Sequence, residues 1–141
     1  MKEEKARKIE LKTDRLIIRT PDEKDAHDVF VLMSDLEIAE STGFRPMSTL
    51  SEAEGKIRRD MESHLMFCIF EKQCPEHCIG VFEVAPCRTS LASWGKFSYE
   101  ICYFLSRESR GKGYMTEVVE MMKCYLFNER MADSLTIAVL P

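Results

Sequence analysis

The sequence feature that most restricts the fold is a pair of glycines, Gly111 and Gly113, set between a strand pattern and a helix pattern. Apolar side chains alternate over residues 97–105 and recur at helical spacing over residues 115–126. A strand that passes through a short polar turn into a helix leaves backbone N–H groups unpaired at the helix start, where they can hold a phosphate. The segment therefore predicts an anion-binding turn.

The residue types of this turn suit a diphosphate. Glycine has no Cβ to hold a phosphate away from the amides, and it accepts the backbone angles that make several N–H groups converge. Arg110 and Lys112 add positive charge beside Gly111 and Gly113. A turn that only joins a strand to a helix has the same pattern, so the glycines alone are a weak signal.

The residues around the turn exclude two other phosphate-binding motifs. A dinucleotide fingerprint needs a small residue at position 116, where Thr116 stands, and a parallel βαβ unit instead of an antiparallel hairpin. A P-loop needs Lys and Ser or Thr after its last glycine, but Tyr114 and Met115 follow Gly113. Both interpretations fail.

The rest of the chain predicts strands and helices in one domain. Strands are expected over residues 9–19, 97–105 and 135–140, with an antiparallel hairpin of residues 65–70 and 78–84. Two capping boxes, Thr20–Glu23 with Pro21 at the first helical position and Thr49–Glu52, predict helix starts. The first helix is expected to place Ala26, Val29, Phe30, Met33 and Leu36 on its core face. The 141 residues, 45% of them hydrophobic, suffice for a single core.

Composition excludes several classes of protein. The 20 Lys and Arg against 24 Asp and Glu give a net charge of −4, which lacks the basic footprint of a nucleic-acid binder. No signal sequence or membrane span is recognisable, so a cytoplasmic protein is expected. The six cysteines are expected as reduced thiols. Cys74, His77 and Cys78 lack the further ligands of a zinc site and are interpreted as a hairpin turn, so no metal is expected.

The order of these elements resembles the GNAT superfamily of N-acetyltransferases. The resemblance rests on three segments: Thr13–Arg19, Glu100–Leu105 and Arg110–Glu117. Within the superfamily they look like the ribosomal-protein alanine N-acetyltransferase (RimJ/RimL-like) branch. The resemblance implies an α+β, three-layer fold with a mixed, mostly antiparallel sheet flanked by helices, in one domain over residues 1–141. It also implies acetyl-CoA as cosubstrate and a primary amine as acceptor, with a protein N-terminus as one option.

The resemblance assigns the cofactor contacts residue by residue. It implies that the backbone of Phe104, Leu105 and Ser106 pairs with the pantetheine arm of CoA. The amides of the following turn would hold the pyrophosphate: Ser109, Arg110, Gly111, Lys112, Gly113 and Tyr114. Glu108 stands where the superfamily usually has Gln or Arg, a departure that this branch shares.

Catalysis needs a neutral amine, a polarised thioester carbonyl and an acceptor for a proton. A backbone N–H near Leu105 is expected to stabilise the oxyanion. Glu100 is the candidate general base, directly or through water, although a solvated or ion-paired carboxylate on the polar strand face fits the sequence equally. Cys102, on the same face, is expected to be a small apolar residue and not a nucleophile.

Relatives in the superfamily continue beyond a strand equivalent to 135–140 with a helix and a closing strand. The sequence is therefore expected to be C-terminally incomplete, truncated after the fifth main strand, with an open apolar edge that predicts homodimer formation. Three hypotheses stay open: a fragment of a longer reading frame, completion of the sheet by a partner chain, or an inactive fragment that binds CoA or self-associates.

Overall fold

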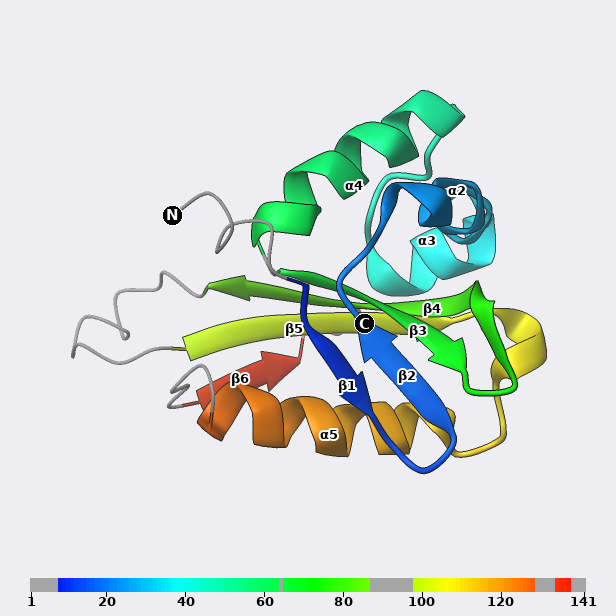
Figure 1. The fold of residues 1–141 in the computed structure, drawn as a ribbon. Helices are drawn as coiled ribbons and strands as arrows, with labels where there is room; N and C mark the ends of the chain where they lie inside the picture. Colours follow the sequence, from blue (N-terminus) through cyan, green and yellow to red (C-terminus); the bar gives the residue numbers. More distant parts are fainter. Residues whose placement is uncertain (1–7, 64, 87–97, 129–133, 138–141) are drawn as a thin grey trace.

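The computed structural model describes residues 8–63, 65–86, 98–128 and 134–137 (Figure 1). The strands are β1 (Glu10–Lys12), β2 (Leu16–Arg19), β3 (Met66–Glu71), β4 (Cys74–Pro86), β5 (Ser98–Leu105) and β6 (Ser134–Ile137). The α-helices are α2 (Ala26–Met33), α3 (Leu36–Thr42), α4 (Leu50–Ser63) and α5 (Tyr114–Asn128), and two 3-10 turns are η1 (Glu23–Asp25) and η3 (Arg107–Ser109).

The strands form one sheet in chain order, β1-β2-β3-β4-β5-β6. Neighbours from β1 to β5 are antiparallel, whereas β6 runs parallel to β5, from the pair Ser98–Ser134 to the pair Ile101–Ile137. The parallel step follows the long crossover through α5, as a parallel connection requires. The predicted mixed, mostly antiparallel sheet in an α+β fold is confirmed.

Helices cover both faces of the sheet and make three layers. Helix α5 lies along one face, and α2, α3 and α4 lie over the other (Figure 1). On the α5 side, Val118, Met122 and Leu126 are fully buried against side chains that include Leu16 and Phe82. The second core joins helices α2 to α4 to the other sheet face through Val29, Ile57, Met66, Phe70 and Val81.

A β-bulge in β4 lets one strand serve both cores. Ile69 pairs with Gly80 and Phe70 with Cys78, so Ile79 has no cross-strand partner. The extra residue reverses the alternation, and Ile79 packs into the α5 core while Cys78 packs into the other. The bulge lies beside the end of β5, where the glycine turn begins.

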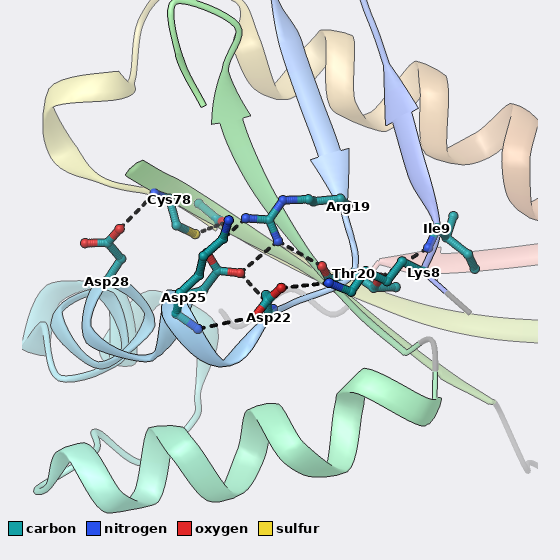
Figure 2. A network of polar contacts seen from close by, with 10 residues as sticks. Lys8, Ile9, Arg19, Thr20, Asp22, Asp25, Asp28 and Cys78 are labelled. Carbon is teal, nitrogen blue, oxygen red and sulfur yellow. Dashed lines mark hydrogen bonds and ion pairs between the residues drawn. The ribbon is translucent and has the colours of Figure 1, made fainter. Parts of the chain in front are cut away.

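The chain enters helix α2 through a compact polar network (Figure 2). Arg19 donates two hydrogen bonds to the buried carboxylate of Asp25, Nη1 to Oδ2 at 2.8 Å and Nη2 to Oδ1 at 3.0 Å. Two parallel bonds in this geometry are strong and directional. The guanidinium also lies 4.1 Å from the centre of the Phe70 ring, so Arg19 joins β2, β3 and the helix start.

The predicted capping box at this helix start was wrong in its residues. Asp22 is the cap: its side chain accepts from the N–H of Lys24, and Asp25 accepts from the N–H of Asp22 at 2.8 Å. Thr20 is buried and accepts a hydrogen bond from the N–H of Ile9 at 3.2 Å, and Pro21 precedes the cap. This bond to Ile9, the residue before β1, holds Thr20 outside the helix. The second predicted box is confirmed, with Thr49 and Glu52 bonded reciprocally at the start of α4.

Two predicted elements are each divided in the structure. The expected strand 9–19 is a hairpin, in which the N–H of Thr13 bonds to the carbonyl of Leu16 at 2.9 Å across the turn between β1 and β2. The expected first helix ends at Met33, and Asp35 caps α3 by accepting from the N–H of Glu37 at 2.9 Å. Leu36, predicted on the core face, is consequently 69% exposed.

The predicted β3–β4 hairpin is confirmed, but its turn is shorter than expected. Lys72 and Gln73 form the turn, and β4 begins at Cys74. Residues 75–77, predicted to lie in the turn, are strand residues opposite a second irregularity in register. Pro75 has no N–H to donate and is tolerated at such an irregularity.

Candidate functional site

The glycine turn has the backbone conformation that its glycines were expected to allow. Gly111 and Gly113 have φ angles of 79° and 81°, in the left-handed region that other residues rarely occupy. Within the described part of the chain, no protein acceptor is bonded to the N–H groups of residues 111–113. The first helical bond of α5 runs from Glu117 to the carbonyl of Gly113. The turn therefore presents free amides at a helix start.

The serines on either side of η3 fix the turn to the sheet. The N–H of Ser106 donates to the carbonyl of Ile79 at 2.8 Å, which extends the β4–β5 pairing past the end of β5. The Ser106 hydroxyl donates to the hydroxyl of buried Ser109 at 2.9 Å. Ser106 and Ser109, both predicted cofactor contacts, thus also build the frame that positions the amides.

Arg107 and Arg110, which precede Gly111, form ion pairs at the start of helix α3. Arg107 lies 3.0 Å from Asp35, and this pairing holds the pKa of the Asp35 carboxyl below its usual value. Arg110 lies 2.9 Å from Glu37 and donates from Nε to the carbonyl of Leu105 at 3.2 Å. These contacts join residues about seventy positions apart, and no sequence pattern indicates them. Lys112 forms no ion pair with any described residue and stays exposed at the turn.

Tyr114 joins the turn to the β1–β2 and β3–β4 ends of the sheet. Its hydroxyl donates to Glu71 at 2.6 Å, a bond that raises the pKa of the phenol. The guanidinium of Arg15 lies 4.7 Å from the ring centre, and the Lys112 ammonium lies 5.7 Å from it. The sequence places Arg15 only in the segment Thr13–Arg19 and gives no sign that it lies beside the turn.

The end of β5 has a free edge in the described structure. Pairing with β6 stops at Ile101, so on that side no described strand faces residues 102–105. Their other side pairs with β4, from Glu83–Cys102 to Gly80–Leu105. The side chains of Phe104 and Leu105 are buried, Phe104 against the ring of Phe44 at 5.5 Å. Among the described residues, this half of β5 is therefore paired on one side only.

Glu100 lies in the other half of β5, on the face that carries α4. It lines a pocket of about 270 Å³ with Cys102, Glu83, Lys56 and Asp60. Lys56 contacts Asp60 at 3.2 Å and forms a short ion pair with Glu83. Glu100 is exposed and forms no ion pair with any described residue.

The structure therefore separates the predicted site residues into two groups. Residues 104–114 gather at one end of β5, while Glu100 lies five residues back along the strand, about 16 Å at the rise of an extended chain. Cys102 lies between them, and burial together with Glu83 and Glu100 raises the pKa of its thiol. A thiol with a raised pKa is a poor nucleophile at neutral pH.

The cysteines and histidine singled out as metal-like do not converge. Cys78 is buried and donates to the carbonyl of Gly80, whereas Cys74 is exposed beside Glu76. His77 lies 3.3 Å from Asp28. Over the described ranges, no group of three such side chains is arranged to hold a metal ion.

Comparison with known proteins decides the family. Residues 15–141 match the family model described as "Acetyltransferase (GNAT) domain". The chain belongs to the GNAT family. Members of the family are acetyl-CoA-dependent N-acetyltransferases, and the family predicted from the sequence is thereby confirmed. No curated protein matched the chain in a sequence search.

Solved structures share the GNAT fold with this chain. An acetyltransferase from Bacillus anthracis has a TM-score of 0.71 and 19% identity over 88% of this chain and 69% of its own. The ribosomal L7/L12 α-N-protein acetyltransferase RimL has a TM-score of 0.72 and 16% identity over 92% of this chain and 71% of its own. Spermidine N-acetyltransferase from Vibrio cholerae, solved with CoA and spermine, has a TM-score of 0.73 and 16% identity over 89% and 71%.

None of the helices in the described ranges is long and apolar enough to cross a membrane.

Proposed function

We propose that this GNAT domain binds acetyl-CoA with its pyrophosphate on the turn Ser109–Tyr114 and transfers the acetyl group to a primary amine. The observation that carries the proposal is the set of free N–H groups at Gly111, Lys112 and Gly113 at the start of α5. Amides and a helix start offer positive partial charge to a diphosphate without any bound cation. A Cβ built at Gly111 meets no atom within 4 Å, so the turn faces open space where a ligand fits.

The pantetheine arm follows the free edge of β5 in this proposal. No described strand pairs with residues 102–105 on that side, and we assign the backbone groups that point there to an amide-containing arm. The arm carries the thioester from the turn toward the half of the strand that holds Glu100. The oxyanion site expected near Leu105 is about 16 Å from Glu100, too far for one water to join them. In this proposal a backbone N–H of β5 nearer Glu100 therefore supports the negative charge that develops on the carbonyl oxygen.

Glu100 acts as the general base in the proposed reaction. An α-amino group, with a pKa of about 7.7–8.0, is already partly neutral near neutral pH, so a carboxylate acting through water suffices. The acceptor nitrogen attacks the thioester carbonyl, the proton passes to Glu100, and the CoA thiolate leaves. Lys56 offsets only one of the three carboxylates around the pocket, those of Glu83, Asp60 and Glu100, and the remaining negative charge favours an amine that arrives as an ammonium ion.

A protein N-terminal amino group is our preferred acceptor, because it loses its proton more readily than a lysine or polyamine nitrogen. The solved relatives include both kinds of enzyme, named for the L7/L12 α-amino group and for spermidine. A ribosomal-protein acceptor would place the reaction in the cytoplasm. We also propose that two copies associate through the β6 edge, which sedimentation velocity tests.

The test is CoA release from acetyl-CoA, followed with a thiol reagent, for three acceptors at pH 7.5. The acceptors are a peptide with a free N-terminus and an internal lysine, the same peptide with its N-terminus acetylated, and spermidine. We expect turnover with the free N-terminus and little with the blocked peptide. Turnover with spermidine alone would contradict the preferred acceptor, and binding of acetyl-CoA without any turnover would support an inactive CoA binder instead.

A further inference from the structure

Arg15 lies beside the glycine turn although it is almost one hundred residues away in the sequence. One terminal nitrogen of its guanidinium, Nη2, is 3.4 Å from the position that a Cβ on Gly113 would occupy. The group also lies over the Tyr114 ring, 4.7 Å from its centre. The charge of Arg15 is therefore placed at the same end of α5 as the free amides.

The backbone and side chain of Arg15 are held in this position from several directions. Its N–H donates to Glu117 at 3.2 Å, its carbonyl accepts from the N–H of Lys72 at 3.0 Å, and its Nε donates to Glu117 at 2.6 Å. Thr13 donates to the same carboxylate. An arginine held in this way loses little conformational freedom when it binds a ligand.

The terminal nitrogens of Arg15 remain available. Neither Nη1 nor Nη2 donates to a protein acceptor in the described ranges, and the side chain of Arg15 is 46% exposed. Arg107 and Arg110, in contrast, direct terminal nitrogens to Asp35, the N-cap of α3, and to Glu37 in its first turn. The turn's own arginines are thus already paired, and Arg15 offers a planar donor pair to an incoming anion.

We infer that Arg15 is a cofactor-binding residue whose two terminal nitrogens contact a phosphate of CoA at the Gly113 side of the turn. This inference rests on the proposed function, because it takes the turn as the phosphate site. The pairing with Glu117 through Nε leaves the outer face of the guanidinium for the phosphate, which suits the bidentate geometry that arginine prefers. Glu117 is accordingly a positioning residue.

The experiment measures dissociation constants by calorimetry for CoA and for 3′-dephospho-CoA. The proteins are the wild type, Arg15→Gln, Arg15→Lys, Glu117→Gln and the control Arg58→Gln, an exposed arginine on α4. Loss of one charge-assisted contact predicts roughly tenfold weaker CoA binding by Arg15→Gln. Arg15→Lys should recover part of that loss, and Arg58→Gln should match the wild type. Thermal melts of each variant establish that it is folded.

The two ligands and Glu117→Gln make the result decisive. Weaker binding of both ligands by Arg15→Gln assigns the contact to the pyrophosphate, and weaker binding of CoA alone assigns it to the 3′-phosphate. Glu117→Gln retains a side-chain oxygen that can accept from Nε of Arg15, so the guanidinium keeps its position and the variant should bind CoA about as tightly as the wild type. Arg15→Gln that binds like wild type, or Glu117→Gln that loses as much affinity as Arg15→Gln, overturns the inference. A wild type that binds no CoA overturns the proposed function itself.

Discussion

Arg110 donates a hydrogen bond from Nε to the carbonyl of Leu105 at 3.2 Å, so two predicted cofactor contacts are bonded to each other. The same guanidinium reaches Glu37 on α3 through Nη1 at 2.9 Å. The glycine turn is thereby joined to the helical layer on the opposite side of the sheet. Arg110 thus connects β5 to α3, and the Glu37 carboxylate partly offsets its positive charge before any phosphate binds.

We expect Glu37→Gln to tighten binding of acetyl-CoA roughly twofold to threefold, the size of effect typical of an exposed charge. The change removes a carboxylate near the proposed phosphate site and leaves Arg110 free to contact the ligand. Calorimetric titration at low salt measures the difference, which should shrink as salt screens it. Glu40→Gln on the same helix is the matched control. Weaker binding by Glu37→Gln would contradict this expectation and show that the Arg110–Glu37 ion pair is needed to hold the turn in its binding conformation.

Gly80→Ala should destabilise the protein by about 1–3 kcal/mol, the usual cost of overpacking. A Cβ at Gly80 would lie 2.6 Å from the carbonyl oxygen of Phe104 and 2.7 Å from the Leu105 side chain. Backbone would have to move at the end of β5, which carries the turn. Urea unfolding measures the effect.

Gly55→Ala is the matched control for this substitution. Gly55 lies within α4, where an added Cβ would come no closer than 3.9 Å to Arg59. Alanine is there favoured over glycine by about 0.5–1 kcal/mol. Equal stability of the Gly80→Ala variant and the wild type would contradict the close approach of Phe104 and Leu105 to Gly80.

Glu100→Gln should lower kcat by about 100-fold or more, the usual contribution of a general base, with little change in KM for acetyl-CoA. The side chain lies far along β5 from the glycine turn, so loss of its charge should leave cofactor binding intact. Glu120→Gln, on the exposed face of α5, should retain wild-type turnover. Superimposable pH–rate profiles for wild type and Glu100→Gln would remove Glu100 as the base.

The carboxylate of Glu117 should make stability depend on pH in the acid range. Burial alone would raise its pKa, but hydrogen bonds from Thr13 and Arg15 outweigh burial and lower it. A folded-state pKa below the unfolded value of about 4.3 stabilises the protein above that pH. This stabilisation is lost as the pH falls through 4.3 toward the folded-state pKa. Urea unfolding between pH 3 and pH 6 should show a shallower dependence for Glu117→Gln; parallel curves would contradict this assignment.

Local patterns in the sequence predicted most elements and the turn. Three local signals match three observed features. The alternation along 97–105 matches β5, the two glycines match the turn, and the helical spacing after Gly113 matches α5. The errors occurred where a tertiary contact overrides a local one. Thr20 bonds to Ile9, just before β1, instead of capping a helix, and Asp35 caps a new helix while binding Arg107.

The contacts around the turn could not be predicted in the same way. Arg15 and Glu117 are 102 residues apart, and Arg110 and Glu37 are 73 apart, with no spacing rule to join them. The chain order of Arg15 gives no indication that the β1–β2 turn reaches the start of α5. Sequence periodicity identifies which face of an element is buried, but it does not identify which surface ends meet.

The glycine turn is tested most directly as the cofactor site by calorimetric titration of acetyl-CoA into the wild type and into a Gly111→Trp, Gly113→Trp variant. The two tryptophans would fill the space in front of the free amides and strain backbone that lies at φ near 80°. We predict saturable binding by the wild type and at least tenfold weaker binding by the variant, with circular dichroism spectra that match. Equal affinity in the two proteins would contradict the assignment of the glycine turn as the cofactor site.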